Sequence, residues 1–186
     1  MTSPRDPKAE LRRTLRRARL DAASQVAQSA AIRDHLRDWL ATHPARIIAC
    51  FAALPGEPML LPLFAEFPER HWVLPRIVGE TMRFHFADAA TLATGHFGIH
   101  EPPADSPVRK PAEIELFLCP GMAFTRGGIR LGRGKGYYDR ALAQSKAEAM
   151  KIGVCFSEQV LAELPADPHD VPMHFLATPE GIERNT

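Results

Sequence analysis

Residues 115–140 read ELFLCPGMAFTRGGIRLGRGKGYYDR, and the rest of the chain can be arranged around this stretch. It begins with an apolar run, 115–119, that is typical of a buried strand, and continues into a loop holding six of the chain's twelve glycines. We expect a helix over 137–147 to leave this loop. Because ligands of parallel sheets collect beyond the carboxyl ends of strands, the strand, loop and helix together predict a binding site at the loop.

Short runs rich in β-branched and aromatic residues lie on both sides of this unit. They predict further strands at 47–52, 72–75, 82–86, 152–156 and 175–178, with 82–86 at an edge or in a hairpin. Helical or loop stretches alternate with them, a pattern typical of an α/β fold with a mostly parallel sheet. A chain of 186 residues that is 45% hydrophobic suits one core, so we predict a single domain over 1–186.

The chain begins with two predicted helices. Asp6 is a candidate N-cap before Pro7 at the first helical position, and the helix that follows is strongly basic. The cationic residues of this segment are Lys8, Arg12, Arg13, Arg16, Arg17 and Arg19. A second helix is predicted over 22–41, with Val26 and Leu36 among its buried residues and His43-Pro44 ending it. Between 95 and 111, glycine, proline and charge predict an ordered surface loop.

Composition narrows the possible partners and compartment. The formal net charge is only +1, so we expect no nucleic-acid partner unless a local basic patch supplies one. The three cysteines, Cys50, Cys119 and Cys155, lie in apolar runs, which predicts buried reduced thiols and a cytoplasmic location. The charged N-terminal region lacks an apolar run long enough for a signal peptide or membrane span, so we expect no membrane association.

The glycine loop has the chemistry of a polyanion cradle. Glycines let backbone N–H groups approach an anion closely, while Arg130, Arg133 and Lys135 add cationic donors. The common P-loop pattern does not fit, because it would need glycine at 129 and serine or threonine at 136, where the chain has Ile129 and Gly136. A flexible, solvated basic turn is the simpler alternative. The aromatic residues and carboxylate that follow favour a nucleoside triphosphate site.

The stretch 130–139 resembles the signature of the 5-formyltetrahydrofolate cyclo-ligase family, also called 5,10-methenyltetrahydrofolate synthetases. Supporting similarities extend along most of the chain: Lys8, Leu11 and Arg12, Gly56-Glu57, Pro75-Arg76, Gly98-Ile99 with Glu101-Pro102, Pro120-Gly121 with Ala123-Phe124, and His169-Asp170. The resemblance implies a three-layer αβα fold with a mostly parallel central sheet. It also implies an enzyme that uses ATP and Mg²⁺ to convert 5-formyltetrahydrofolate into 5,10-methenyltetrahydrofolate, acting on small molecules as a monomer.

The same resemblance assigns roles to individual residues. It implies that ATP is bound by Lys8, Arg12, Arg130, Leu131, Gly132, Arg133, Gly134, Lys135, Gly136, Tyr137 and Tyr138. The folate substrate would contact Glu57, Arg133, Gly134, Lys135, Gly136 and Tyr137, and Mg²⁺ would be held by Asp139 and Asp170. Arg133, Lys135 and Tyr137 are the implied catalytic residues, with Arg133 and Lys135 placed to stabilise the transferring phosphoryl group.

Other interpretations remain open at this point. The basic loop and first helix also suit a non-catalytic module that binds RNA or phosphate, or a kinase acting on another small molecule. The chain also departs from the family pattern beside the core motif, at Pro58, Met59, Thr125 and His174. We expect these departures to affect rate and substrate contacts more than reaction class.

Overall fold

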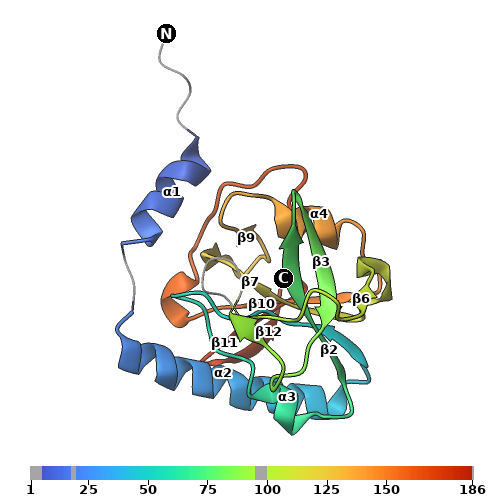
Figure 1. Ribbon diagram of the computed structural model, residues 1–186. Helices are drawn as coiled ribbons and strands as arrows, with labels where there is room; N and C mark the ends of the chain where they lie inside the picture. The colour runs from blue at the N-terminus through green and yellow to red at the C-terminus, as the bar shows by residue number, and fades with distance from the viewer. Residues whose placement is uncertain (1–5, 18–19, 95–99, 186) are drawn as a thin grey trace.

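A central eight-stranded sheet organises the computed structural model, which describes residues 6–17, 20–94 and 100–185 (Figure 1). Its helices are α1 (Pro7–Leu15), α2 (Ala22–Thr42), α3 (Leu63–Glu66) and α4 (Tyr137–Leu142), with short 3-10 turns at Pro111–Glu113 and Ser157–Gln159. Its strands are β1 (Ile47–Ala49), β2 (His71–Val78), β3 (Thr81–Phe86), β4 (Ala93–Thr94), β5 (His100–Glu101), β6 (Val108–Arg109), β7 (Leu116–Pro120), β8 (Ala123–Phe124), β9 (Arg130–Leu131), β10 (Met150–Val154), β11 (Phe175–Thr178) and β12 (Gly181–Arg184).

The strands follow the order β12-β11-β10-β7-β1-β2-β3-β6 across the sheet. The pairs from β11 through β10, β7 and β1 to β2 are parallel, whereas β12, β3 and β6 pair antiparallel at the two edges. Strand β7, from which the sequence interpretation started, therefore lies near the centre of the sheet. The expected mostly parallel sheet is confirmed.

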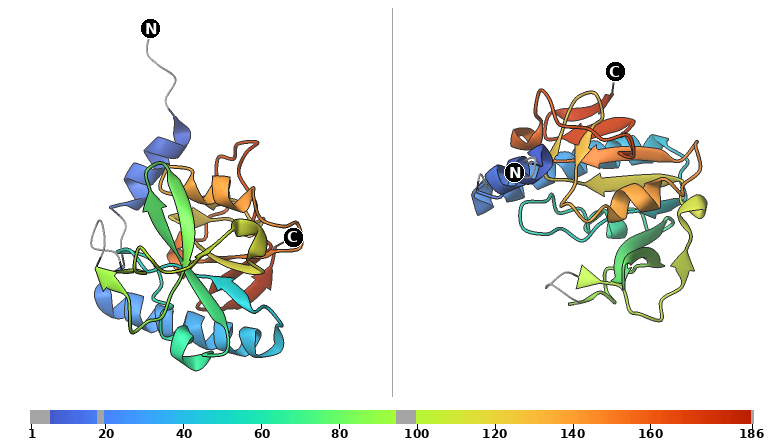
Figure 2. Two further views of the ribbon diagram at one scale, coloured as in Figure 1. Left: turned by 45° about the vertical axis from the view of Figure 1, so that its right-hand side comes forward. Right: turned by 90° about the horizontal axis from the view of Figure 1, so that it is seen from above.

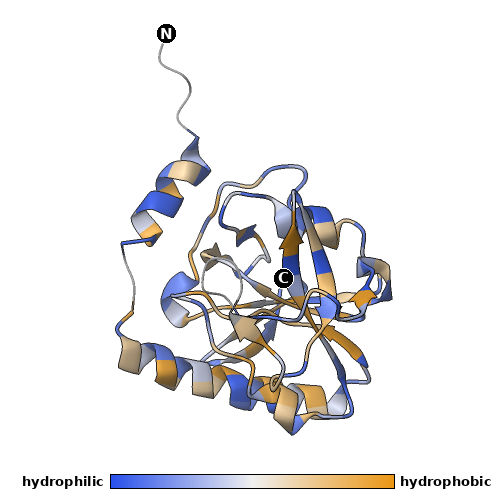
Figure 3. Cartoon of the chain, viewed as in Figure 1, coloured by the Kyte–Doolittle hydropathy of each residue, from blue (hydrophilic) through white to orange (hydrophobic). Residues whose placement is uncertain are grey.

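Side chains alternate between two apolar layers, one on each face of the sheet. On β7, Leu116 and Leu118 belong to the layer shared with α2 and α3, while Phe117 and Cys119 belong to the layer shared with α4. The period of two along a strand produces this division. Figures 1 and 2 show α2 lying along one face of the sheet, and Figure 3 shows hydrophobic colouring along the central strands but mostly hydrophilic colouring on α1. The three-layer αβα architecture is thereby confirmed.

The predicted helix starts agree with the structure. Asp6 caps α1 by accepting a hydrogen bond from the backbone N–H of Lys8, and Asp21 caps α2 in the same way through Ser24. Helix α2 ends at Thr42, one residue beyond the prediction. Val26 is 56% exposed, so its expected burial was wrong. The buried residues of α2 begin one turn later, at Ser29, and continue with Ile32, Leu36 and Leu40.

Several boundaries and short strands differ from the prediction. Helix α4 ends at Leu142, not at 147, and β1 ends at Ala49, not at 52. The segment 95–111 was expected to be a loop, yet its described part contains β5 and β6, and β6 is the edge strand beside β3. The predicted hairpin character of β3 is confirmed by its antiparallel pairing with β2. Arg19, Gly98 and Ile99, named in the sequence interpretation, lie outside the described residues.

The cysteines and the helices were the features on which the expected compartment rested. Cys50, Cys119 and Cys155 are buried free thiols, as predicted, and burial raises the pKa of Cys50 and of Cys119 to about 12. None of the helices in the described part of the chain combines the length and the apolar character needed to cross a bilayer.

Candidate functional site

A cleft of about 480 Å³ opens at the carboxyl ends of β1, β2 and β7. Residues that follow these strands line it, including Ala52 after β1 and Gly121 after β7. The predicted site residues also line this cleft: Lys8, Arg12, Glu57, Arg130, Leu131, Gly132, Arg133, Gly134, Lys135, Gly136, Tyr137, Tyr138, Asp139 and Asp170. Residues from α1, the glycine loop and the chain after β10 are thus brought to one place. Their individual roles stay predictions.

The glycine loop is more elaborate than the sequence indicated. The first part of this loop forms a small hairpin of β8 and β9, with Ala123 opposite Leu131. After β9 the backbone takes positive φ values at Gly134 (100°) and Gly136 (65°), a conformation that L side chains rarely adopt. Gly136 is the N-cap of α4. Glycine at these two positions lets the loop turn sharply, so that Lys135 and Tyr137 both reach the cleft.

Helix α1 is fastened to the site by its cationic side chains. The Lys8 ammonium lies 2.6 Å from Asp170 Oδ2 and 2.7 Å from Asp167 Oδ2. One turn along, Arg12 Nε donates a hydrogen bond of 2.9 Å to the carbonyl oxygen of Gly132. The basic helix, to which the resemblance assigned two ATP-binding residues, therefore forms one wall of the cleft.

The contact between Lys8 and Asp170 favours the charged form of both groups. Burial alone would lower the pKa of Lys8, but hydrogen bonds and charge from Asp167 and Asp170 outweigh it and raise that pKa. Burial acts in the opposite direction on Asp170, yet Lys8 and the backbone N–H of Asp167 hold the pKa of this carboxyl below its ordinary value. The ion pair thus persists across the neutral pH range.

Glu57 and Arg133 connect the loop after β1 to the glycine loop. Glu57 Oε1 accepts hydrogen bonds from Arg133 Nε at 3.0 Å and Nη2 at 2.7 Å, while Oε2 accepts from the N–H of Leu54 at 3.0 Å. The Glu57 side chain is buried, whereas that of Arg133 is 40% exposed. Burial raises the pKa of Glu57, although the charge of Arg133 and the two donors oppose that rise. A buried carboxylate thereby orients a guanidinium that still faces the cleft.

Arg130 is turned into the protein. Its Nη2 donates to Asp139 Oδ1 at 2.6 Å, and its Nη1 donates to the carbonyl oxygen of Pro120 at 3.3 Å. The guanidinium carbon lies 5.3 Å from the centre of the Tyr138 ring, and burial raises the pKa of Tyr138 well above its ordinary value. These contacts let Arg130 hold Asp139 and the start of α4 in place.

The carboxylates expected to hold a metal occupy two settings. Asp139 is paired with Arg130, whereas Asp170 groups with Asp167 and His169, whose potential ligand atoms lie within 4.8 Å of one another. Oxygen ligands of this kind suit Mg²⁺, which binds one or two carboxylates plus phosphate oxygens and waters. Asp167, His169 and Asp170 are therefore a donor set of the kind that suits a divalent cation, with both aspartates held by Lys8 in this structure, whereas Asp139 lies outside that group. Asp167 was missed by the sequence interpretation, although its spacing in the run Asp-Pro-His-Asp was a usable signal.

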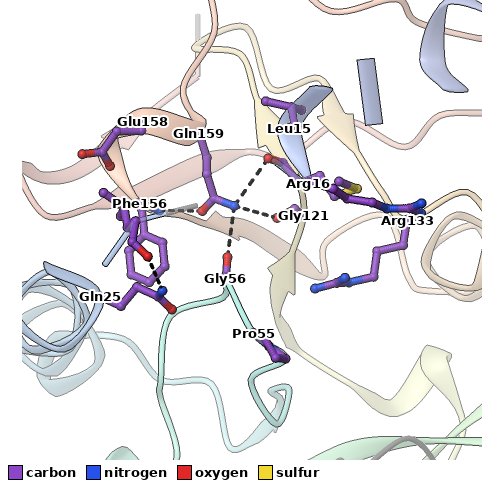
Figure 4. Close-up of a pocket in the computed structure, with 12 residues that line it drawn as sticks. Leu15, Arg16, Gln25, Pro55, Gly56, Gly121, Arg133, Phe156, Glu158 and Gln159 are labelled. Carbon is purple, nitrogen blue, oxygen red and sulfur yellow. Dashed lines mark hydrogen bonds between the residues drawn. The ribbon is translucent and has the colours of Figure 1, made fainter. Parts of the chain in front are cut away.

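Gln159 is a second residue that sequence reasoning missed. Its Nε2 lies within hydrogen-bond distance of three carbonyl oxygens, those of Gly56 (3.2 Å), Gly121 (3.3 Å) and Met122 (3.4 Å), and its Oε1 accepts from the N–H of Phe156 at 2.9 Å (Figure 4). It borders a side pocket of about 100 Å³ that shares Gly121 and Arg133 with the main cleft. Gln159 thus ties together the loops that follow β1, β7 and β10.

Comparison with known proteins shows which family the chain belongs to. The chain matches the 5-formyltetrahydrofolate cyclo-ligase family over residues 4–179. The chain belongs to this family. A 5,10-methenyltetrahydrofolate synthetase from Aquifex aeolicus has a TM-score of 0.83 and 33% identity, over 95% of this chain and 92% of that one. A second such synthetase, from Mycoplasma pneumoniae, has a TM-score of 0.76 and 26% identity, over 92% and 98%.

Curated cyclo-ligases align over shorter spans. The Mycolicibacterium smegmatis protein is 43% identical over 48% of this chain and 47% of its own length. The Schizosaccharomyces pombe relative, a probable cyclo-ligase, is 35% identical over 60% and 63%. The Escherichia coli cyclo-ligase is 26% identical over 74% and 80%. The sequence matches thus span about half to four fifths of these relatives, while the structural matches span nearly all of theirs.

The departures from the family pattern lie away from the cleft lining. Thr125 is buried, and its Oγ1 accepts from the N–H of Ile129 at 3.1 Å, which closes the turn between β8 and β9. His174 accepts a hydrogen bond from the N–H of Lys151 at its Nδ1. Pro58 and Met59 follow Glu57 but are absent from the residues that line the cleft. None of the four is among the residues that line the cleft, and their expected effect on rate and substrate contacts stays a prediction.

Proposed function

We propose that this protein is an ATP-dependent 5-formyltetrahydrofolate cyclo-ligase. Family membership supports the folate reaction. The observation that carries the proposal is the gathering of Arg133 and Lys135, the buried Glu57, and the carboxylates around Asp170 along one cleft at the carboxyl ends of parallel strands. The cations suit the triphosphate of ATP and the carboxylate suits the pterin of the folate. The two substrates must lie side by side for a phosphoryl group to pass between them.

The proposed reaction passes the γ-phosphoryl group of ATP to the formyl oxygen of the folate. That oxygen is a poor leaving group, and phosphorylation converts it into one. The N10 nitrogen then attacks the formyl carbon and loses its proton, the bond from carbon to oxygen breaks, and phosphate leaves. The products are 5,10-methenyltetrahydrofolate, ADP and phosphate. Catalysis of this kind depends on positioning and on neutralising charge.

The residues along the cleft suit these tasks. Lys135 is exposed, and its ammonium has no hydrogen-bond or ion-pair partner within the described part of the chain, so it is available to a phosphate. Arg133, oriented by Glu57, presents a second cation to the transferring group. Glu57 also offers its carboxylate to the amino and ring N–H donors of a pterin. Tyr137, which starts α4 and lines the cleft, is proposed to contact the formyl group.

A divalent cation would be held by Asp170, with Asp167 and Asp139 as further oxygen donors. When bound, it would neutralise charge on the phosphate oxygens of ATP. Lys8 and Arg12 reach the same region from α1 and are proposed to bind the phosphates. Reduced, buried thiols at Cys50, Cys119 and Cys155 are consistent with our proposal of a cytoplasmic location.

The direct test incubates the purified protein with 5-formyltetrahydrofolate, ATP and Mg²⁺ and follows the ultraviolet absorbance of the methenyl product. Product formation that requires both substrates is the expected result. ATP turnover without methenyl product would instead favour a kinase of another small molecule. Nucleic-acid binding that weakens steeply with salt, without turnover, would favour the RNA-binding alternative.

Lys135→Ala tests the phosphate cradle within the same assay. Loss of one preorganised donor to transition-state charge is expected to lower kcat about 10² to 10³-fold. The matched control is Lys146→Ala, an exposed lysine that is absent from the cleft lining. Both variants should unfold at the same temperature as the parent protein, because neither side chain packs in the core. Normal turnover by Lys135→Ala would contradict its assigned role.

A further inference from the structure

We propose that Arg140 is a positioning residue that fastens the β2–β3 hairpin to the glycine loop and thereby sets the apolar wall of the folate side of the cleft. This inference rests on the proposed folate reaction for its substrate. Arg140 follows Asp139 on α4 and is exposed, and it is absent from the residues that line the cleft. Its contacts, however, connect three separate parts of the site.

The guanidinium of Arg140 reaches the hairpin, the loop and the helix start together. Its Nη1 donates to the carbonyl oxygen of Lys135 at 3.0 Å, and its Nη2 donates to the carbonyl oxygen of Glu80, at the tip of the hairpin, at 3.3 Å. Its carbon atom lies 5.2 Å from the centre of the Tyr137 ring. A planar group with several fixed donors can make these contacts at once, whereas a lysine ammonium cannot span them.

The backbone at Gly136 lies close to this guanidinium. A Cβ atom at Gly136 would lie 2.9 Å from Arg140 Nη1, so the end of the Arg140 side chain would have to shift. Glycine at 136 therefore permits the positive φ of the loop and also lets Arg140 keep the position that it has in this structure. Loop shape and hairpin position are coupled at this point.

The hairpin brings an apolar surface to the cleft. Ile77 on β2 and Met82 on β3 are cross-strand partners, and both line the cleft. Ile77 is 40% exposed, so part of its side chain is open to the cleft that it lines. Such a wall suits a flat aromatic ring and not a phosphate; we assign it to the pterin of the folate substrate, and the KM values below distinguish this from the adenine of ATP. Figure 1 shows the tip of this hairpin rising beside α4.

Without Arg140, the hairpin tip would lose the one hydrogen bond that this arginine donates to it. A β-hairpin that projects from the edge of a sheet is held weakly by its own ladder, so loss of a tether at its tip increases its motion. Motion of Ile77 and Met82 weakens folate binding, and motion of the Lys135 carbonyl disturbs the loop. An ordinary exposed arginine would change none of these properties.

The first experiment needs no catalysis. Hydrogen exchange is compared for the parent protein, Arg140→Ala, Arg140→Lys and the control Arg126→Ala, an exposed arginine paired with Glu183. We expect amides 78–82 to exchange about tenfold faster in Arg140→Ala, the change that loss of one hydrogen bond from a charged donor produces. Arg140→Lys should recover part of the protection and Arg126→Ala should keep all of it. Unchanged exchange at 78–82 would overturn the proposal.

The second experiment uses the methenyl assay. Arg140→Ala should raise KM for 5-formyltetrahydrofolate several-fold, with a smaller change in KM for ATP and an unchanged unfolding temperature. Ile77→Ala should raise the same KM, while Val108→Ala, an equally exposed aliphatic residue on β6, should not. Equal KM values for 5-formyltetrahydrofolate in Arg140→Ala and Arg126→Ala would refute the proposal that Arg140 positions the apolar wall of the folate site. Lack of methenyl product from the parent protein would refute the proposed function, and the exchange result would still decide the tether.

Discussion

Replacement of Lys8 by alanine should release α1 from the cleft without unfolding the sheet. The Lys8 ammonium bridges Asp170 at 2.6 Å and Asp167 at 2.7 Å. The Lys8 and Asp170 side chains are both 11% exposed, but that of Asp167 is 47% exposed, so the Asp170 contact dominates. A hydrogen bond to a charged group contributes about 1.5–3 kcal/mol. The exposed arm to Asp167 adds about 0–1 kcal/mol.

We therefore expect Lys8→Ala to weaken the docking of α1 by about 2 kcal/mol. The population of molecules with α1 undocked should rise about 30-fold. The assay is native-state hydrogen exchange without nucleotide. Amides 8–15 should lose about 30-fold in protection, whereas amides of β7 and β10 should keep theirs. Omission of ATP separates this structural effect from the proposed phosphate contact of Lys8.

Arg13→Ala is the matched control on the same helix, because Arg13 is exposed and pairs only with Glu10 among the described residues. Its exchange pattern should equal that of the parent protein. Unchanged protection of α1 in Lys8→Ala would refute the view that this ammonium holds the helix. Equal losses in α1 and β7 would refute it too, since they would report a fall in global stability.

Three further outcomes follow from burial and backbone geometry. Gly128→Ala should lower the free energy of unfolding by about 2–4 kcal/mol in urea titrations, because φ is 88° there and a Cβ would lie 2.5 Å from the carbonyl oxygen of Met173. Gly127→Ala, where the nearest atom is 3.7 Å away, should change it little, and similar losses in both would contradict this account. Glu57→Gln should weaken folate binding but leave the free energy of unfolding at pH 7 unchanged or higher. Burial raises the pKa of Glu57, so its ionised form lowers the stability of the protein at pH values above the ordinary pKa of 4.5. A clear loss of stability in this variant would contradict the argument. Docking of α1, read by exchange, should be complete near neutral pH and should weaken progressively once the pH falls below the ordinary carboxyl value of 3.8. Asp170 contributes fully above that value, and its contribution is lost only as the pH falls through its lowered pKa. Docking that stays unchanged after this carboxyl is protonated would exclude it.

Local signals predicted much of the fold. The Asp6-Pro7 start of α1, the length of α2 and the strand at 175–178 each depend on interactions within a few residues, which the sequence displays directly. The short pairs β8–β9 and β4–β5 and the edge strand β6 were missed, because strands of two residues have no periodicity to detect. The exposure of Val26 depends on which other elements pack against α2, and the periodicity of the helix does not contain that information.

The amino-acid sequence by itself determined the glycine loop with its cations, the α/β alternation and the resemblance to the cyclo-ligases, because these are properties of neighbouring residues. Only the tertiary structure decided that Lys8 pairs with Asp170, that Glu57 orients Arg133, and that Arg140 reaches the tip of the hairpin. These contacts join residues that are far apart along the chain or lie on different elements. Their distances are set by the order and twist of the strands between them, and that order is fixed by the packing of the whole sheet.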